Sequence, residues 1–300
     1  MIDDKKYKRV SIDGAPKIGE GAHGVVYRIS EDTIVKAYRP FVSLDKIKRE
    51  KELARWAFVN NIPTAISFDI VEVGDGYGVV FELLNAKSAA DYVNESVENL
   101  EDFTKKSVEL MNNIHSVEVE PGKLPDMKQQ TIGWVEKCRK YMSSDVCDKI
   151  EAFVRSVPDS NMLLHADYHL GNIMVSGDEL MLIDMDTLCT GDPIFEMATI
   201  YNSYKEFPSI NEEAVAFLGI DMPTAERLWD NTLKLYTGGD REAMEDTADR
   251  AQLLGCIRVI DFMDRKPEHP ESSKCIEICT RDIESLITNR RTLVTLVELA

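Results

Sequence analysis

The architecture follows from residues 163–175, which read LLHADYHLGNIMV. Here Asp167 and Asn172 stand five positions apart in a polar loop between two apolar runs. A further apolar run at residues 180–186, LMLIDMD, contains Asp184. Carboxylate and carboxamide oxygens are the protein ligands that suit Mg²⁺, which also binds nucleotide phosphates. Because three such side chains at strand ends rarely recur in this order by chance, they predict a site for Mg²⁺ and a phosphorylated ligand.

Two histidines stand on either side of this aspartate, at positions 165 and 169. Neither has a metal-site spacing relative to the cysteines. For His165 we expect hydrogen bonds that brace the loop, because this is the commoner role of a histidine in such a position.

A glycine-rich segment, IGEGAHGVV, occupies residues 18–26 and contains the pattern G-x-G-x-x-G-x-V. Its members are Gly19, Gly21, Gly24 and Val26. Glycine lets backbone N–H groups approach phosphate oxygens closely. Alone the match is weak, since a glycine-rich hairpin without a ligand would look the same. A dinucleotide-binding βαβ unit is excluded by context, because a β-run follows the third glycine where a helix should begin.

Lys36 lies in a β-run over residues 33–38 and has apolar neighbours. It could reach inward to nucleotide phosphates, with Glu50 on the next helix balancing its charge. A lone lysine in a strand usually lies on the solvated face instead. The order of glycine loop, strand lysine and helix glutamate favours the ligand-binding interpretation.

The first part of the chain predicts an antiparallel sheet interrupted by one helix. The β-runs, which have a hairpin turn signal at Gly74-Asp75-Gly76, cover residues 25–29, 33–38, 66–73 and 77–83. The helix is expected over residues 44–60, with Ser43 as its N-cap. After Leu84, apolar residues at helical spacing predict helices, among them one through residues 100–114 and others from Glu212 to the end. The chain therefore predicts an α+β fold of two lobes, residues 1–84 and residues 85–300.

The composition is that of a globular protein, with 300 residues of which 44% are hydrophobic. There are 53 acidic and 35 basic side chains, which gives a formal net charge of −18. Wide contact with nucleic acid or anionic lipid needs clustered lysine and arginine, so neither partner is expected. The charge primarily favours solubility, and a cationic substrate is the second interpretation.

The six cysteines form no C-x-x-C pair and predict reduced thiols in the core. The polar N-terminus is not followed by the apolar region of a signal peptide, and no apolar run approaches membrane-spanning length. We therefore expect a cytoplasmic protein with no membrane partner.

Together these motifs resemble the protein-kinase-like superfamily. The loop H-A-D-Y-H-L-G-N, in which His169 follows Asp167 by two places, is similar to the H-G-D-x-H-x-x-N loop of aminoglycoside phosphotransferases and choline kinases. The runs IDMD at residues 183–186 and GDPIFEMA at residues 191–198 are similar to I-D-x-[DE] and G-D-P-x-x-D-L-A of that branch. The resemblance spans roughly residues 15 to 200. Ala166 replaces the usual glycine, and Glu196 replaces an aspartate that braces the loop.

The resemblance implies a two-lobed kinase-like fold and an enzyme that moves the γ-phosphoryl group of ATP or GTP onto a hydroxyl of a small molecule. In this interpretation Asp167 accepts the hydroxyl proton or orients the nucleophile, while Asn172 and Asp184 hold Mg²⁺. The remaining nucleotide contacts would come from Lys36 fixed by Glu50, from the loop of Gly19, Gly21, Gly24 and Val26, and from backbone groups of Glu82 and Leu84.

Two other interpretations stay open. A serine/threonine protein kinase is disfavoured by His169, where lysine is usual, and by the lack of D-F-G and A-P-E motifs. A nucleotide-binding pseudoenzyme that serves as an interaction module is disfavoured because every polar group required for phosphotransfer is present. The sequence predicts no oligomeric state.

The resemblance implies that the acceptor is a hydroxyl compound, and a cationic one such as an aminoglycoside or choline is one candidate. After residue 200 the chain places acids near aromatics, which together suit an ammonium group through ion pairing and cation–π attraction. The alternative is that these are helices with solvated acids and inward-packed aromatics. The residues concerned are Tyr201, Tyr204, Glu206, Trp229, Asp230, Tyr236 and Asp240.

Overall fold

The computed structural model describes residues 7–211 and 213–289. Contacts divide the chain into a first unit, Met1–Ser88 with Asn172–Asp186, and a second unit, Ala89–Gly171 with Thr187–Ala300. The sequence predicted one crossing near residue 84 and did not assign residues 172–186 to the first unit. Within the predicted helical segment from Glu212 to the end, residue 212 and residues 290–300 lie outside the described residues.

The first unit contains a six-stranded sheet in the order β1-β5-β6-β4-β3-β2. The strands are β1 (Lys8–Arg9), β2 (Lys17–Glu20), β3 (Gly24–Arg28), β4 (Thr33–Tyr38), β5 (Ser67–Val73) and β6 (Gly76–Glu82). All neighbours pair antiparallel except β1, which runs parallel to β5. The four predicted strands are confirmed. The sequence missed β1 and β2, because both are short and mostly exposed and so show no apolar pattern.

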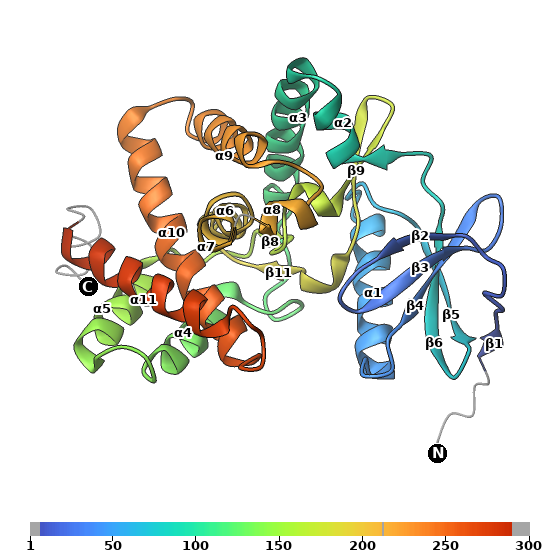
Figure 1. The fold of residues 1–300 in the computed structure, drawn as a ribbon, viewed down its shortest axis with the longest axis horizontal. Helices are drawn as coiled ribbons and strands as arrows, with labels where there is room; N and C mark the ends of the chain where they lie inside the picture. The colour runs from blue at the N-terminus through green and yellow to red at the C-terminus, as the bar shows by residue number, and fades with distance from the viewer. Residues whose placement is uncertain (1–6, 212, 290–300) are drawn as a thin grey trace. The chain divides into compact units, whose positions relative to one another are not determined.

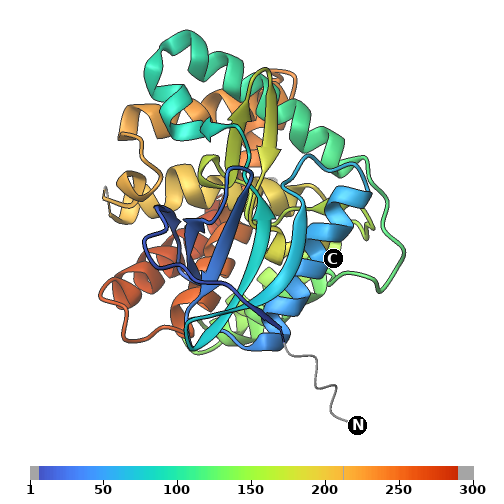
Figure 2. The ribbon, with the colours of Figure 1, turned by 90° about the vertical axis from the view of Figure 1, so that its right-hand side faces the viewer.

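Helix α1 (Leu44–Val59) packs against β5 and β6, as Figure 2 shows. It begins where predicted, because the Ser43 side chain accepts a hydrogen bond from the Lys46 N–H. Its buried face consists of Ile47, Glu50, Leu53, Ala54 and Ala57. One position of this face is therefore a carboxylate.

A second, three-stranded sheet in the first unit has the order β10-β9-β7. Its strands are β7 (Lys87–Ser88), β9 (Ile173–Ser176) and β10 (Glu179–Leu182). The β9–β10 hairpin turns at Gly177, whose φ of +60° suits glycine. Its open end carries Asn172 on one side and Ile183 on the other, where the Ile183 N–H donates to the Asn172 carbonyl at 2.9 Å.

The second unit is mainly helical, and α10 packs against α4, α6 and α11 (Figure 1). Its helices are α2 (Ala89–Glu95), α3 (Val97–His115), α4 (Met127–Cys138), α5 (Ser144–Ser156), α6 (Ile194–Tyr201), α7 (Phe207–Ile210), α8 (Ala214–Phe217), α9 (Met222–Tyr236), α10 (Arg241–Asp264) and α11 (Ser272–Asn289). Short strands β8 (Leu163–Leu164) and β11 (Cys189–Thr190) pair antiparallel. The predicted α+β class is confirmed.

The described residues also form two 3₁₀ turns and one π-helix. The segments Leu170–Asn172 and Met185–Thr187 are 3₁₀ turns, and Asn202–Glu206 is a π-helix that joins α6 to α7. The six cysteines are free and buried, as predicted. In the part of the chain that the structure describes, no helix has both the length and the apolar character needed to span a bilayer.

Candidate active site

Lys36 connects two acidic side chains of the first unit. Its Nζ lies 2.6 Å from Glu50 Oε1 and 3.0 Å from Asp184 Oδ1. Burial alone would lower the pKa of Lys36, but the carboxylates of Asp184 and Glu50 outweigh burial and hold this pKa above its ordinary value. Lys36 is therefore a positive charge held in place by residues of α1 and of the segment after β10.

The register of the sheet places apolar side chains on both sides of Lys36. Val26 is its cross-strand partner in β3, and the fully buried Val79 is its partner in β6. Directly paired residues point to the same face of a sheet. Lys36 thus lies in an apolar row, on the face that also carries α1.

The fold requires only one of the three glycines of the predicted phosphate loop. A Cβ added at Gly24 would lie 2.6 Å from the Ala37 carbonyl oxygen, so the packing of β3 on β4 itself demands glycine. Nothing lies within 4 Å of the corresponding position at Gly21, and at Gly19 only the Val26 side chain does. Neither Gly19 nor Gly21 has a positive φ. The fold does not require these two glycines, and they leave space beside the backbone.

A cluster of carboxylates surrounds Lys36. Oxygens of Glu50, Asp184 and Asp186 lie within 4.8 Å of one another. Burial raises the pKa of Asp186, and the neighbouring Asp184 raises it further. The sequence assigned no role to Asp186, whose carboxylate lies 3.6 Å from Lys46 Nζ. Acids held this close repel one another, so the donor set fits a hard divalent cation.

His23, in the glycine-rich loop, approaches the same carboxylate: its Nδ1 lies 3.9 Å from Asp186 Oδ2. Burial and the nearby Lys46 lower the pKa of His23. The other ring nitrogen of His23 is 3.1 Å from Lys46 Nζ. The loop is thus tied to the acidic cluster through a histidine and a lysine that sequence reasoning missed.

Asn172 and Asp184 stand on the two sides of the open end of the β9–β10 hairpin. Asn172 is buried, and Asp184 has a φ of +64°. A left-handed conformation costs a non-glycine residue about 1 kcal/mol, so other contacts must hold Asp184 in it. The hydrogen bond to Lys36 is one such contact.

The predicted base-binding residues lie at the end of β6. The Glu82 N–H already donates to the Ile66 carbonyl at 2.9 Å, so a base would have to use the Glu82 carbonyl instead. Leu84 follows the strand. The role of both residues stays a prediction.

Asp167, in the second unit, has a histidine as its neighbour. His169 Nε2 lies 3.6 Å from Asp167 Oδ2. Because His169 Nδ1 accepts from the Gly171 N–H at 3.0 Å, the ring N–H is on Nε2, the nitrogen that lies 3.6 Å from Asp167 Oδ2. Burial alone would raise the pKa of Asp167, but His169 and Arg258 lower it well below its usual range. Asp167 is therefore an ionised carboxylate, with a side chain that is 43% exposed.

Glu196 holds the backbone of the loop that contains Asp167. Its carboxylate is fully buried and accepts from the backbone N–H groups of His165 at 2.7 Å and Ala166 at 2.9 Å. The longer side chain therefore performs the bracing expected of the usual aspartate. The expectation for the His165 side chain was wrong: among the described residues its ring nitrogens have no hydrogen-bond partner, and the ring packs edge-on against Tyr168 at 6.2 Å. The backbone of His165 makes the bracing contacts.

Arg258 of α10 also holds the backbone of this loop. Its Nη1 donates to the Ala166 carbonyl at 2.6 Å, and its guanidinium lies over the Trp134 ring. Ala166 has a φ of +62°, which explains why glycine is usual here, since alanine pays a backbone cost of about 1 kcal/mol. Sequence reasoning missed Arg258, which is 92 residues away along the chain.

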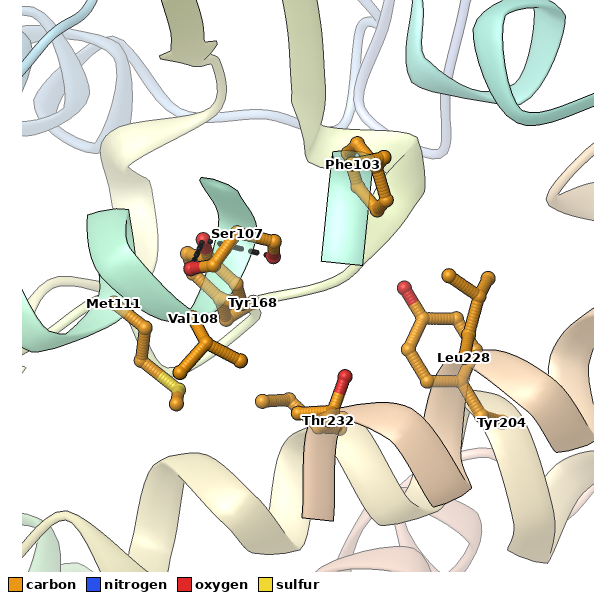
Figure 3. A pocket seen from close by; sticks show the side chains of 9 residues that line it. Phe103, Ser107, Val108, Met111, Tyr168, Tyr204, Leu228 and Thr232 are labelled. Atoms are coloured by element: carbon orange, nitrogen blue, oxygen red, sulfur yellow. Dashed lines mark hydrogen bonds between the residues drawn. The ribbon is translucent and has the colours of Figure 1, made fainter. Parts of the chain in front are cut away.

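Two tyrosines support the loop through their hydroxyl groups. The Leu170 N–H donates to the Tyr204 hydroxyl oxygen at 2.9 Å, and the Tyr168 hydroxyl donates to the Ser107 carbonyl at 2.8 Å. Figure 3 shows both tyrosines at a small cavity, on different sides of it. The cavity is lined by Phe103, Ser107, Val108, Met111, Tyr168, Ile200, Tyr204, Leu228 and Thr232.

Three of the seven acids and aromatics considered after residue 200 are core residues, whereas Asp230 and Asp240 are exposed. Tyr204, Glu206 and Trp229 are each at most 5% exposed, and Trp229 packs edge-on against Tyr201 at 5.2 Å. These three side chains do not present a surface to an acceptor. The alternative of inward-packed aromatics holds for Tyr204 and Trp229, but its expectation of solvated acids is wrong for Glu206, which is buried.

Comparisons with known proteins agree with this geometry. Residues 14–229 match the phosphotransferase enzyme family. None of the curated proteins compared with the chain matches it. A GDP complex of an aminoglycoside 2'-phosphotransferase of type IIIa has 12% identity and a TM-score of 0.62, over 96% of this chain and 95% of that one.

Two further structures have a similar fold. A choline/ethanolamine kinase family protein from Mesorhizobium loti has 12% identity and a TM-score of 0.59, over 95% of this chain and 92% of that one. The ADP-bound aminoglycoside phosphotransferase APH(2'')-Ib has 15% identity and a TM-score of 0.57, over 92% and 93%. The similarity confirms the predicted protein-kinase-like fold. Because the family match covers residues 14–229, which include both the Lys36 cluster and the Asp167 loop, the chain belongs to the phosphotransferase enzyme family.

Proposed function

We propose that the protein is a small-molecule kinase that transfers the γ-phosphoryl group of ATP or GTP to a hydroxyl group. The observation that carries this proposal is the position of Lys36 Nζ, 2.6 Å from Glu50 and 3.0 Å from Asp184. A partly buried lysine held by a helix glutamate and a strand-end aspartate is an arrangement suited to nucleotide phosphates. The fold and the family support the same reaction.

In the proposed reaction the first unit binds the nucleotide. Lys36 neutralises charge on the α- and β-phosphates, and the space beside Gly19 and Gly21 lets backbone N–H groups approach phosphate oxygens. Asn172 and Asp184 would hold Mg²⁺, and Asp186 adds a third oxygen donor. When bound, the ion neutralises charge on the phosphoryl oxygens.

The second unit supplies the acid–base group. Asp167 is ionised, so it can accept the proton of an acceptor hydroxyl or orient that hydroxyl for attack. His169 and Arg258 keep it ionised, and Glu196 fixes the backbone just before it. The new bond joins the hydroxyl oxygen to phosphorus, the bond from phosphorus to the β,γ-bridging oxygen breaks, and the nucleoside diphosphate leaves.

A screen for nucleoside diphosphate release tests this function. Purified protein is incubated with Mg·ATP or Mg·GTP and with aminoglycosides, choline, ethanolamine, sugars, nucleosides or a protein substrate. We expect release that depends on one class of small hydroxyl compound and is absent in the Asp167→Asn variant. Release that requires the protein substrate would favour a protein kinase, and tight nucleotide binding without turnover on any acceptor would favour a pseudoenzyme.

A cationic acceptor stays part of the proposal as one class within that screen. Attraction between exposed charges is screened by salt, so the KM of a cationic acceptor should rise with ionic strength. Arg258, a positive charge beside the loop, opposes this class. A neutral acceptor whose KM does not change with ionic strength would leave the kinase assignment intact and exclude a cationic acceptor.

Replacing Lys36 by methionine should have two separate effects. Loss of the charge that meets the phosphates raises the nucleotide KM or lowers kcat. It also leaves Glu50 buried without its cation, which costs up to about 3 kcal/mol of apoprotein stability. The double variant Lys36→Met/Glu50→Leu should regain much of that stability and none of the activity, as thermal unfolding and steady-state kinetics would measure. If the double variant regained activity, Lys36 would have no role in binding the nucleotide.

Replacing Arg258 by glutamine should lower kcat by about tenfold and spare the nucleotide KM, because Arg258 positions the loop without a role in nucleotide binding. Since the guanidinium lowers the pKa of Asp167, its loss raises that pKa. The acid limb of the kcat profile should therefore move to higher pH in Arg258→Gln. In Arg258→Lys, which keeps a positive charge, this limb should lie closer to its wild-type position. A drop in kcat with an unmoved pH profile would indicate a structural role only.

A further inference from the structure

Four acidic side chains are buried among the described residues, and three of them have strong partners. Glu50 is paired with a lysine at 2.6 Å. Glu196 accepts from two backbone N–H groups, with a histidine 3.7 Å away. Asp261 is bonded to a lysine at 2.8 Å and an arginine at 2.7 Å. The fourth, Glu206, is 1% exposed and is surrounded differently.

The side chains hydrogen-bonded to Glu206 are two thiols, while the charges of Asp282 and Arg281 shift its pKa in opposite directions. Cys279 Sγ lies 3.3 Å from Glu206 Oε1, and the ligand atoms of Glu206, Cys256 and Cys279 all lie within 4.8 Å of one another. Both cysteines are fully buried. No lysine, arginine or histidine in the described part of the chain forms an ion pair with Glu206. Because thiols are weak hydrogen-bond donors, they compensate poorly for the burial of a carboxylate.

Two thiols and a carboxylate form a set of donors that a thiophilic divalent cation prefers. Zinc is bound by cysteine sulfur at about 2.3 Å and by carboxylate oxygen at about 2.0–2.2 Å. In a tetrahedral site these bond lengths separate a sulfur ligand from an oxygen ligand by about 3.5 Å. The observed distance of 3.3 Å between Cys279 Sγ and Glu206 Oε1 is close to that spacing. We propose that Glu206, Cys256 and Cys279 form a binding site for a zinc-like divalent cation.

A further oxygen donor lies near the same segments. Asn202 is 4% exposed, and its Oδ1 has no hydrogen-bond partner in the described part of the chain. Its Nδ2 donates to the carbonyl of Gly255, the residue before Cys256. Asn202 and Glu206 are the first and last residues of the π-helix. A tetrahedral site has four ligands, and the fourth would be water or this amide oxygen after a side-chain rotation.

The site joins three segments that are distant in sequence: the π-helix, α10 and α11. The π-helix also carries Tyr204, whose hydroxyl oxygen accepts a hydrogen bond from the Leu170 N–H in the loop that contains Asp167. A cation at Glu206 would thus stabilise the segment that supports that loop. It would be distinct from Mg²⁺, which prefers oxygen ligands and avoids thiolates. The proposal does not depend on the phosphotransfer activity.

The test uses the wild-type protein and cobalt as an optical substitute for zinc. Metal-free protein, prepared with a chelator and kept reduced, is titrated with Co²⁺. We expect a sulfur-to-cobalt charge-transfer band that saturates at about one ion per chain, and Zn²⁺ should abolish it by competition. Metal analysis of the protein as purified should return about one zinc per chain.

Variants separate the site from the other cysteines. Cys256→Ser and Cys279→Ser should lose the band, and Glu206→Gln should weaken Co²⁺ binding at least tenfold. Cys275→Ser is the matched control, because Cys275 is buried in the same helix as Cys279 but is not part of the cluster. It should bind Co²⁺ as the wild type does.

The wild-type titration decides the matter even if a variant fails to fold. The absence of a charge-transfer band in folded wild-type protein at saturating Co²⁺ would overturn the proposal. So would a band that survives in both Cys256→Ser and Cys279→Ser. In either case Glu206, Cys256 and Cys279 do not form a metal site.

Discussion

Replacement of Asp167 by alanine should lower kcat by at least about 10²-fold and leave nucleotide affinity within a few fold. A positioned acid–base group contributes about 10²–10⁴ to the rate. The Asp167 carboxylate is ionised and lies in a loop whose backbone is held by Glu196 and Arg258. Its loss should therefore remove a contribution made in the transition state, with little effect on ground-state binding. Steady-state kinetics and nucleotide titration measure the two quantities separately.

Asp184→Ala is the contrasting variant. It removes a carboxylate of the Lys36 cluster, so it should weaken Mg²⁺-dependent nucleotide binding. Asp167→Asn keeps the size of the side chain and controls for packing. If Asp167→Ala and Asp167→Asn both kept wild-type turnover, the assignment of Asp167 as the acid–base group would be wrong.

Replacement of Glu196 by alanine should destabilise the protein by roughly 4 kcal/mol, because it leaves two buried backbone N–H groups without an acceptor. His115, whose Nε2 lies 3.7 Å away, also loses its partner. Chemical denaturation measures the loss. Glu196→Gln keeps the size but places an N–H₂ group opposite one of the donors, so it should lose less than alanine. A change below about 1 kcal/mol in both variants would contradict the bracing role.

The same carboxylate predicts a pH dependence of stability. Burial alone would raise the pKa of Glu196, but His115 and the backbone donors hold it below the ordinary value of 4.5. A lowered folded-state pKa contributes stability above the unfolded value, and this contribution is lost as the pH falls through the folded value. The difference in Tm between wild type and Glu196→Gln should therefore be full at pH 7 and shrink below about pH 4.5. A difference that grows on acidification would contradict this account.

Local patterns predicted much of the first unit. Ser43 followed by apolar residues at helical spacing marked the start of α1, and Gly74-Asp75-Gly76 marked the β5–β6 turn. The order of glycines, Lys36 and Glu50 predicted a contact that the structure contains. Each of these features lies within a short segment or follows from the pairing of neighbouring strands.

The sequence could not indicate contacts between distant segments. Arg258 reaches Ala166 across 92 positions, and no local pattern marks an arginine of a long helix for that role. Asp186 follows Asp184 by two positions, but only the path of the chain after β10 brings both carboxylates to Lys36 and Lys46. The burial of Tyr204 and Glu206 could not be derived from 3.6-residue spacing, because the π-helix that contains them shifts the helical period.

The π-helix also makes one region of the chain sensitive to length. A π-turn holds one residue more than an α-turn, so it behaves as a single-residue insertion accommodated within a continuous helix. Deleting one residue from Asn202–Glu206 would let ordinary α-helical winding resume, so the side chains within this segment would change direction while the flanking helices keep their register. Both the Tyr204 hydroxyl and the Glu206 carboxylate depend on that extra residue for their direction. In an alignment with other members of the family, a one-residue gap at this position would thus signify a differently supported loop, even where each surrounding residue is identical.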